Sequence, residues 1–210
     1  MYPLRQRVMD MTKKRVGKDV ESIRRLNVAV TLLSGGIRPT NVEAVTRLPK
    51  VTLSELWREM YGRPAKGQTP TFAYTFMRSM DMNKGCSLFA TLYKNIAGNV
   101  TGDTTSLEDV EIFIRSYERY LNMAESGAVL SMEQAYYVWR DLRKGFIQLR
   151  PCNRCGASYL YSAHYEATGY VRQCQYCITL GRVRRRVMRI PKKDPHVAMF
   201  SPKKSEDVSQ

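Results

Sequence analysis

Four of the five cysteines form two Cys-x-x-Cys pairs near the carboxyl end of the chain. The pairs are Cys152/Cys155 and Cys174/Cys177, with eighteen residues between them. A Cys-x-x-Cys turn lets two thiolates reach one ion, and Zn²⁺ is well satisfied by four sulfurs in a tetrahedron. Two such pairs separated by about 15–20 residues are typical of a structural zinc module. The sequence therefore predicts one structural zinc ion on these four cysteines.

Other uses of these sulfurs fit the pattern less well. A redox Cys-x-x-Cys normally occurs once, in a βαβ context that this sequence lacks. An iron–sulfur cluster would also accept four thiolates, and the sequence leaves that alternative open. A catalytic zinc needs an open coordination position, and the nearby His164 is more typical of a surface loop. Cys86 stands alone in an apolar helical pattern and is predicted to be a buried core residue.

A basic run follows the second pair. Residues 150–180 contain too few aliphatic side chains to build a core, so the metal must supply it. Seven cations without an acid come next: Arg182, Arg184, Arg185, Arg186, Arg189, Lys192 and Lys193. A rigid metal module followed by a basic arm suits contacts with nucleic-acid phosphates. The alternative interpretation is a solvated run of charge.

The whole chain is basic, with 34 Lys and Arg against 19 Asp and Glu in 210 residues, a net charge of +15. Such a protein usually meets a polyanion, either nucleic acid or an anionic membrane. The longest apolar stretch, residues 26–33, is far shorter than the roughly 20 residues of a spanning helix. The first residues also lack the apolar segment of a secretory signal. We therefore expect a cytoplasmic protein with reduced thiols and no membrane partner.

The elements that must position the cysteines and cations are mostly helices. Four capping-box patterns mark helix starts: Thr40/Glu43, Thr52/Glu55, Thr105/Glu108 and Ser131/Gln134. Apolar residues at helical spacing predict helices at 19–33, 41–48, 53–61, 71–82, 86–97, 106–124 and 132–144. The helical pattern ends near residue 148.

These patterns predict a mainly α fold. A multi-helix N-terminal domain is followed by a small irregular four-cysteine zinc-binding module and a basic, partly disordered tail. The predicted divisions are a basic N-terminal extension at 1–18, a helical domain at 19–148, the zinc module with its basic arm at 149–190, and a flexible tail at 191–210.

Residues 40–61 have the outline of a helix-turn-helix, with 53–61 as the recognition helix. The cations expected to face DNA phosphates there are Arg47, Lys50 and Arg58. Any αα-hairpin of a bundle has the same outline, so both interpretations stand.

Helices 106–124 and 132–144 are rich in aromatic residues: Phe113, Tyr117, Tyr120, Tyr136, Tyr137 and Trp139. They lie in the segment 101–150, where 6 cations and 8 acids leave −2, against +10 before it and +7 after it. This suggests a surface for a protein partner, with a plain hydrophobic core as the alternative.

No nucleotide-binding glycine loop or Gly-x-Ser-x-Gly motif is present, and the chain has two histidines. An enzyme is therefore not expected.

The segments VTLSELWREMYGRPAKGQTP, IRSYERYL, AYYVWRDLRKGFIQL, CNRC and CQYC resemble the FlhC family, the zinc-containing subunit of the bacterial flagellar transcriptional activator. The similarity covers about residues 20–195. It implies a hetero-oligomer with an FlhD-type partner, binding of promoter double-stranded DNA, engagement of RNA polymerase, and zinc on the four paired cysteines. The alternative function is an RNA-binding or ribosome-associated zinc protein. Residues 181–193 contain no aromatics for stacking on single-stranded bases, which favours duplex DNA.

Overall fold

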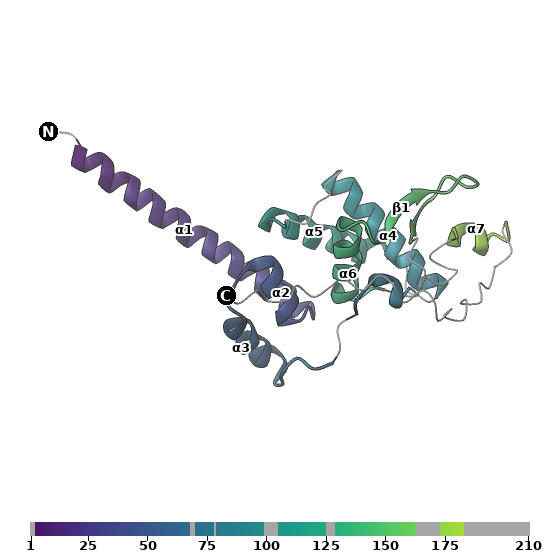
Figure 1. Cartoon of the computed structure of the whole chain (residues 1–210), viewed down its shortest axis with the longest axis horizontal. Helices are drawn as coiled ribbons and strands as arrows, with labels where there is room; N and C mark the ends of the chain where they lie inside the picture. Colours follow the sequence, from purple (N-terminus) through teal and green to yellow (C-terminus); the bar gives the residue numbers. More distant parts are fainter. Residues whose placement is uncertain are drawn as a thin grey trace, which may run out of the picture.

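The computed structural model describes residues 3–67, 70–77, 79–98, 105–124, 129–162 and 173–182, with side chains from residue 19 onward. This part of the chain is mainly helical, as predicted (Figure 1). In chain order its elements are α1 (Pro3–Ser34), α2 (Pro39–Thr46), α3 (Lys50–Tyr61), the short 3₁₀ helix η1 (Ala73–Thr75), α4 (Met80–Ala97), α5 (Leu107–Met123), α6 (Met132–Arg143), β1 (Gln148–Pro151), β2 (Ser158–Tyr161) and α7 (Gln175–Thr179). The predicted tail, residues 191–210, lies outside the described residues.

Two of the four predicted capping boxes lie at or next to real helix starts. At α6, Gln134 N donates to Ser131 Oγ at 3.1 Å and Ser131 N donates to the Gln134 side chain at 3.0 Å. At α5 the box is formed by Ser106 and Asp109, one residue later than predicted. Because both boxes need only residues close in sequence, the pattern identifies them without tertiary information.

The boxes predicted at Thr40 and Thr52 are wrong, since neither α2 nor α3 has a side-chain cap. Prolines mark both starts instead: α2 begins at Pro39, and Pro49 directly precedes α3. The fixed φ of proline suits the start of a helix, and each helix therefore begins before its threonine.

Helix α1 also begins earlier than predicted, at Pro3 rather than residue 19. Lysine and arginine have high helix propensity, so a basic segment can continue a helix that packing fixes farther along. In Figure 1 the amino-terminal part of α1 projects away from the other elements. The second half of the helix supplies core residues, among them Ala29, Leu32 and Leu33.

The predicted helix at 71–82 is not formed. Only η1 and the start of α4 fall within that range. The buried Asp141 carboxylate accepts a hydrogen bond from Ala73 N at 2.6 Å, and Arg140 Nη2 donates to Thr71 O at 2.6 Å. These contacts from α6 hold the segment irregular and override its local helical pattern.

Helices α4, α5 and α6 enclose an aromatic core. The ring of Phe113 lies 5.2 Å from that of Trp139 and 5.9 Å from that of Phe89. All six aromatics that suggested a partner surface are buried: Phe113, Tyr117, Tyr120, Tyr136, Tyr137 and Trp139. That interpretation is wrong, because three helices meet here and hide more aromatic area than one helix face could.

The small two-stranded sheet packs beside α4. Strands β1 and β2 are antiparallel, with Gln148 opposite Tyr161 and Pro151 opposite Ser158. Leu160 of β2 is fully buried in the core formed by the helices. Because Leu160 anchors β2 in this core, the turn between β1 and β2 is held in a defined position relative to the helical body. Among the described residues, no helix is long and apolar enough to cross a membrane.

Candidate metal centre

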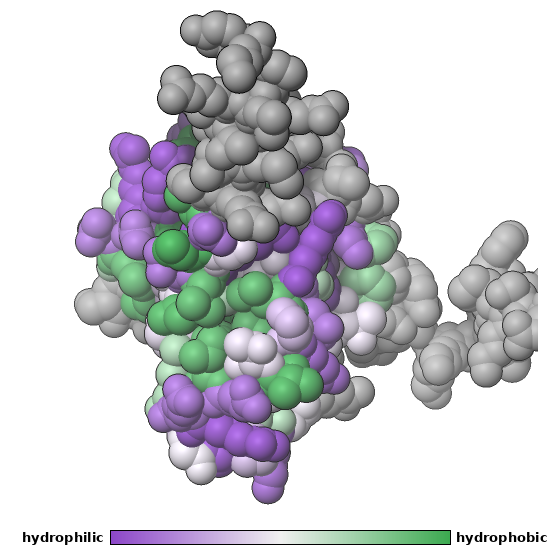
Figure 2. Space-filling view, turned by 90° about the vertical axis from the view of Figure 1, so that its left-hand side faces the viewer, coloured by the Kyte–Doolittle hydropathy of each residue, from purple (hydrophilic) through white to green (hydrophobic). Residues whose placement is uncertain are grey.

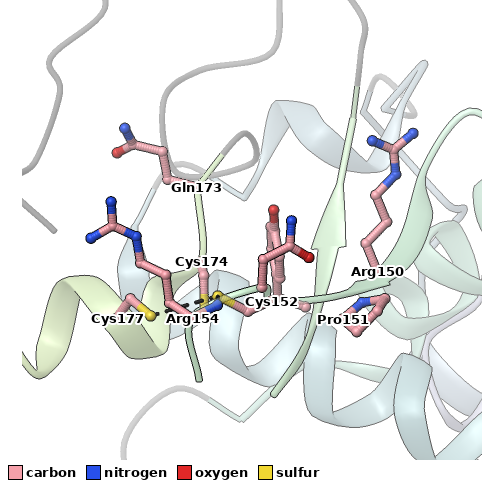
Figure 3. A pocket seen from close by; sticks show the side chains of 9 residues that line it. Arg150, Pro151, Cys152, Arg154, Gln173, Cys174 and Cys177 are labelled. Carbon is pink, nitrogen blue, oxygen red and sulfur yellow. Dashed lines mark hydrogen bonds between the residues drawn. The ribbon is translucent and has the colours of Figure 1, made fainter. Parts of the chain in front are cut away.

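The four paired cysteines converge between the β1–β2 hairpin and α7. Cys152 and Cys155 lie in the turn of the hairpin, whereas Cys174 directly precedes α7 and Cys177 lies within it. All four sulfur atoms lie within 4.8 Å of one another. Two close approaches cross between the pairs: the sulfurs of Cys152 and Cys177 lie 3.6 Å apart (Figure 3), and those of Cys155 and Cys174 lie 3.7 Å apart.

Local backbone bonds shape the first pair. Gly156 N donates to Cys152 O at 2.8 Å and Cys152 N donates to Ala157 O at 3.0 Å, which closes the turn. Gly156 has a φ of +73°, a conformation that side-chain-bearing residues rarely adopt. Arg154 N points to the Cys152 sulfur at 3.4 Å. The turn therefore places both sulfurs on one side.

The second pair is shaped by the short helix α7. Ile178 N donates to Cys174 O at 3.2 Å, and Arg182 N donates to Cys177 O at 2.9 Å. One helical turn separates Cys174 from Cys177, so both sulfurs face the hairpin. Cys177 is fully buried and Cys174 nearly so.

The spacing of the sulfurs fits one tetrahedral ion. Metal–sulfur bonds of about 2.3 Å give sulfur–sulfur edges of about 3.8 Å, close to the observed 3.6 and 3.7 Å. Four thiolates form a soft ligand set that suits zinc. A cluster of several irons would spread the sulfurs farther apart, so the geometry favours a single ion.

The pKa shifts of the thiols show what a bound cation would change. The backbone N–H of Arg154 lowers the pKa of Cys152 to about 6. Burial raises the pKa of Cys177 to about 12 and also raises that of Cys174. Without a cation, the Cys152 sulfur is therefore readily anionic, whereas the buried thiols of Cys174 and Cys177 resist ionisation. A bound metal ion removes that resistance, because its charge stabilises all four thiolates.

A hollow of about 530 Å³ opens beside the sulfurs. Arg150 and Arg154 line it and extend to the same side of the cysteines, together with Gln173 (Figure 3). The Arg150 guanidinium lies 4.0 Å from the Tyr161 ring centroid and donates to Gln148 Oε1 at 2.7 Å. Sequence reasoning missed both arginines, although Arg150 lies two residues before the first cysteine pair and Arg154 lies within it.

Of the predicted basic arm, only Arg182 lies in the described part of the chain. Its carbonyl oxygen accepts a hydrogen bond from Arg154 Nη1 at 3.0 Å, which places it beside the metal centre. The other predicted cations of the arm lie outside the described residues: Arg184, Arg185, Arg186, Arg189, Lys192 and Lys193.

The cations predicted in the α2–α3 hairpin lie elsewhere. Arg47 ends α2 with a φ of +58°. Lys50 and Arg58 line a hollow of about 310 Å³ on the exposed face of α3. In Figure 1 this hairpin and α7 lie on opposite sides of the helices α4, α5 and α6. The hairpin cations are therefore separated from Arg182, the described residue of the predicted arm.

The fold and the site define an α-helical protein with an appended module whose four clustered cysteines could hold a metal ion. Comparison with known proteins gives the family: the chain matches the flagellar transcriptional activator (FlhC) family over residues 11–188 and belongs to it. The resemblance noted in the sequence is confirmed.

Several flagellar transcriptional regulators FlhC are similar to the chain along most of its length. That of Paraburkholderia atlantica is 28% identical over 177 residues, which cover 83% of this chain and 81% of that protein. That of Thauera aminoaromatica is 29% identical over 80% of this chain and 82% of its own length. That of Proteus mirabilis is 27% identical, with coverages of 80% and 83%. The family is thus one of transcriptional regulators.

Proposed function

We propose that this protein is the DNA-binding subunit of a cytoplasmic transcription activator, and that it works with an FlhD-type partner at flagellar promoters and engages RNA polymerase there. One structural zinc ion on Cys152, Cys155, Cys174 and Cys177 would hold the module at 149–190 together beside the helical domain at 19–148. The observation that carries the proposal is the group of arginines at the metal centre of a chain that belongs to a regulator family.

Three arginines make the metal centre suitable for a nucleic-acid backbone. Arg150 is already held by Tyr161 and Gln148, so it loses little freedom when it contacts a phosphate. Arg154 also lines the hollow, and its Nη1 donates to Arg182 O, so the first residue of the predicted basic arm lies beside it. Guanidinium groups match phosphate geometry well. In this arrangement the ion has a structural role, because four sulfurs complete its coordination.

The α2–α3 hairpin is the proposed second contact. Lys50, Ser54 and Arg58 are spaced four residues apart on α3 and line one exposed hollow, while Leu53 faces the core. A recognition helix needs such a division between an inner apolar face and an outer polar face. Arg47, in the turn before α3, would contact the adjacent backbone.

Helix α1 is the proposed partner surface, in place of the buried aromatics. Val20, Ile23, Leu26 and Val30 are exposed on it, the first two at 59% and 60%. The left-hand side of the molecule in Figure 1, turned toward the viewer in Figure 2, carries apolar side chains bordered by hydrophilic ones. These four residues follow the three- and four-residue spacing of a helix-packing stripe. An FlhD-type subunit would cover this stripe.

The test measures binding of the full chain, co-purified with its FlhD-type partner, to promoter duplex, random duplex and single-stranded RNA. Changing Arg150 and Arg154 to alanine should weaken binding to both duplexes. It should also reduce the slope of log K against log salt by up to about 2, one for each phosphate contact. Arg115→Ala with Arg119→Ala on α5 is the control, because it removes the same charge far from the metal centre.

An unchanged slope in the Arg150/Arg154 variant would contradict the proposed contact. If the wild-type complex instead prefers single-stranded RNA, the function is that of an RNA-binding zinc protein.

A further inference from the structure

A single buried hydroxyl group contacts both halves of the metal module. Ser87 lies in α4 and is fully buried. Its Oγ accepts a hydrogen bond from Leu160 N at 3.0 Å and another from Gln175 Nε2 at 2.8 Å. It donates to Asn83 Oδ1 at 3.2 Å. A serine hydroxyl can donate once and accept twice, so its hydrogen-bonding capacity is fully used.

The two donors belong to the two cysteine pairs. Leu160 lies in β2, the strand that leaves the turn containing Cys152 and Cys155. Gln175 directly follows Cys174 and begins α7. Both residues are fully buried. The Ser87 oxygen thus accepts one hydrogen bond from each half of the module. One comes from the backbone of β2, which follows the first cysteine pair, and the other comes from the side chain of Gln175, which lies within the second.

This bond arrangement sets a distance that the metal centre depends on. The sulfur–sulfur approaches cross between the pairs, from the hairpin turn to α7. A shift of α7 relative to the hairpin would therefore change these sulfur–sulfur distances. The other described side-chain bond from α7 to α4 joins Thr179 Oγ1 to Met80 Sδ at 3.5 Å, and sulfur is a weak acceptor. The bond to Ser87 is the stronger restraint.

We propose that Ser87 is a positioning residue of the metal centre: its hydroxyl holds the two cysteine pairs in register and so determines how tightly the metal is kept. Ser87 does not contact the ion and acts only through Leu160 and Gln175. The proposal rests on the metal site proposed above and is independent of DNA binding. It also makes α4, which contributes Phe89 to the aromatic core, a direct mechanical link between that core and the metal.

The test uses the full chain and two metal readouts. Transfer of Zn²⁺ to a chromogenic chelator gives a release rate, and the d–d absorption of bound Co²⁺ reports the coordination geometry. Ser87→Ala should release zinc faster, by about 10–100-fold, the range seen when groups that orient metal ligands are removed. Its Co²⁺ spectrum should also change. Ser87→Thr, which keeps a hydroxyl, should restore much of the wild-type behaviour.

Ser116→Ala is the matched control. Ser116 is likewise buried in a helix, but its hydroxyl donates to Ile112 O at 2.7 Å within α5. It should lower stability without changing zinc release or the Co²⁺ spectrum. Equal release rates for Ser87→Ala and Ser116→Ala would overturn the proposal.

A second variant, Gln175→Met, removes the same bond from its other end. It should speed zinc release as well, and the double variant with Ser87→Ala should be little faster than Ser87→Ala alone, because both changes break one interaction. If the effects of the two changes on the release rate were fully additive, the proposal would be contradicted. If Ser87→Ala does not fold, zinc release from Gln175→Met as slow as from the wild type would contradict it instead. A wild-type chain that binds neither Zn²⁺ nor Co²⁺ would overturn it together with the metal site, whatever its DNA binding.

Discussion

The helical body and the cysteine module are stabilised in different ways. The body buries large side chains such as Trp139, Phe113 and Phe89, which contact one another at ring-centroid distances typical of aromatic packing. Among the described residues from Gln148 to Arg182, the buried apolar side chains are Leu160 and two of the cysteines. The module must therefore take its stability from the metal and from the body beside it.

The difference shows how a small functional unit is attached to a larger one. Helix α4 is common to both, because its apolar face packs in the aromatic core while Ser87 bonds to β2 and to Gln175. We therefore expect the body to fold without metal, and the module to need both the metal and the body to keep its shape. Separating the two contributions experimentally tests this picture.

The largest effect is expected from removal of the metal. Structural zinc sites in small domains contribute about 10–16 kcal/mol of apparent binding free energy. Cys174→Ser, or a strong chelator, should therefore unfold the module while the body stays folded. Hydrogen exchange measured by mass spectrometry should show rapid exchange at 148–162 and 173–182 and continued protection at 107–123. Cys86→Ser, at the cysteine outside the cluster, is the control and should keep the metal. Uniform unfolding of the whole chain would refute the separation.

The second-largest effect is expected from a substitution in the core of the helical body. Trp139→Ala removes a side chain that is 2% exposed, and large-to-small changes of this kind cost about 3–5 kcal/mol. Urea unfolding followed by circular dichroism should show that loss, while the zinc content of the folded fraction stays at one ion per chain. Leu121→Ala, at a residue 46% exposed on α5, should change stability by less than about 0.5 kcal/mol. Loss of zinc in proportion to the loss of stability would show that the two regions form one cooperative unit.

The smallest effect concerns the attachment of α1 to the body. Arg24 donates to both carboxylate oxygens of Glu111 on α5, at 2.6 and 2.5 Å. This bond lowers the pKa of Glu111 below its ordinary value of 4.5. A depressed carboxyl pKa contributes stability that is present above the ordinary value and is lost as the pH falls through the lowered one. Since the pair is partly exposed, the contribution is small.

Glu111→Gln should therefore be slightly less stable than the wild type at pH 7, and the gap should close as the pH falls below 4.5. The midpoints of urea unfolding at several pH values measure this difference in stability. Glu118→Gln, an exposed position on the same helix, removes an equal charge and serves as the control. A gap of constant size at every pH would mean that the ion pair is not its source.

Local patterns predicted two features whose determining residues are neighbours in sequence. The Ser131/Gln134 box forms as predicted. Each Cys-x-x-Cys turn needs only four residues to bring its two sulfurs together, whereas the meeting of the two pairs depends on the tertiary structure. The capping boxes at Thr40 and Thr52 failed at the same local level, since nearby prolines define those helix starts more strongly.

The sequence by itself thus determined the helical class, the four sulfurs and the family. Tertiary structure decided which aromatics are hidden, why residues 71–77 bend around Asp141 instead of forming a helix, and that Ser87 meets Gln175 across 88 positions of sequence. The reason is physical. Helix propensity and turn geometry act over a few residues, whereas burial and long-range hydrogen bonds depend on which elements meet after folding.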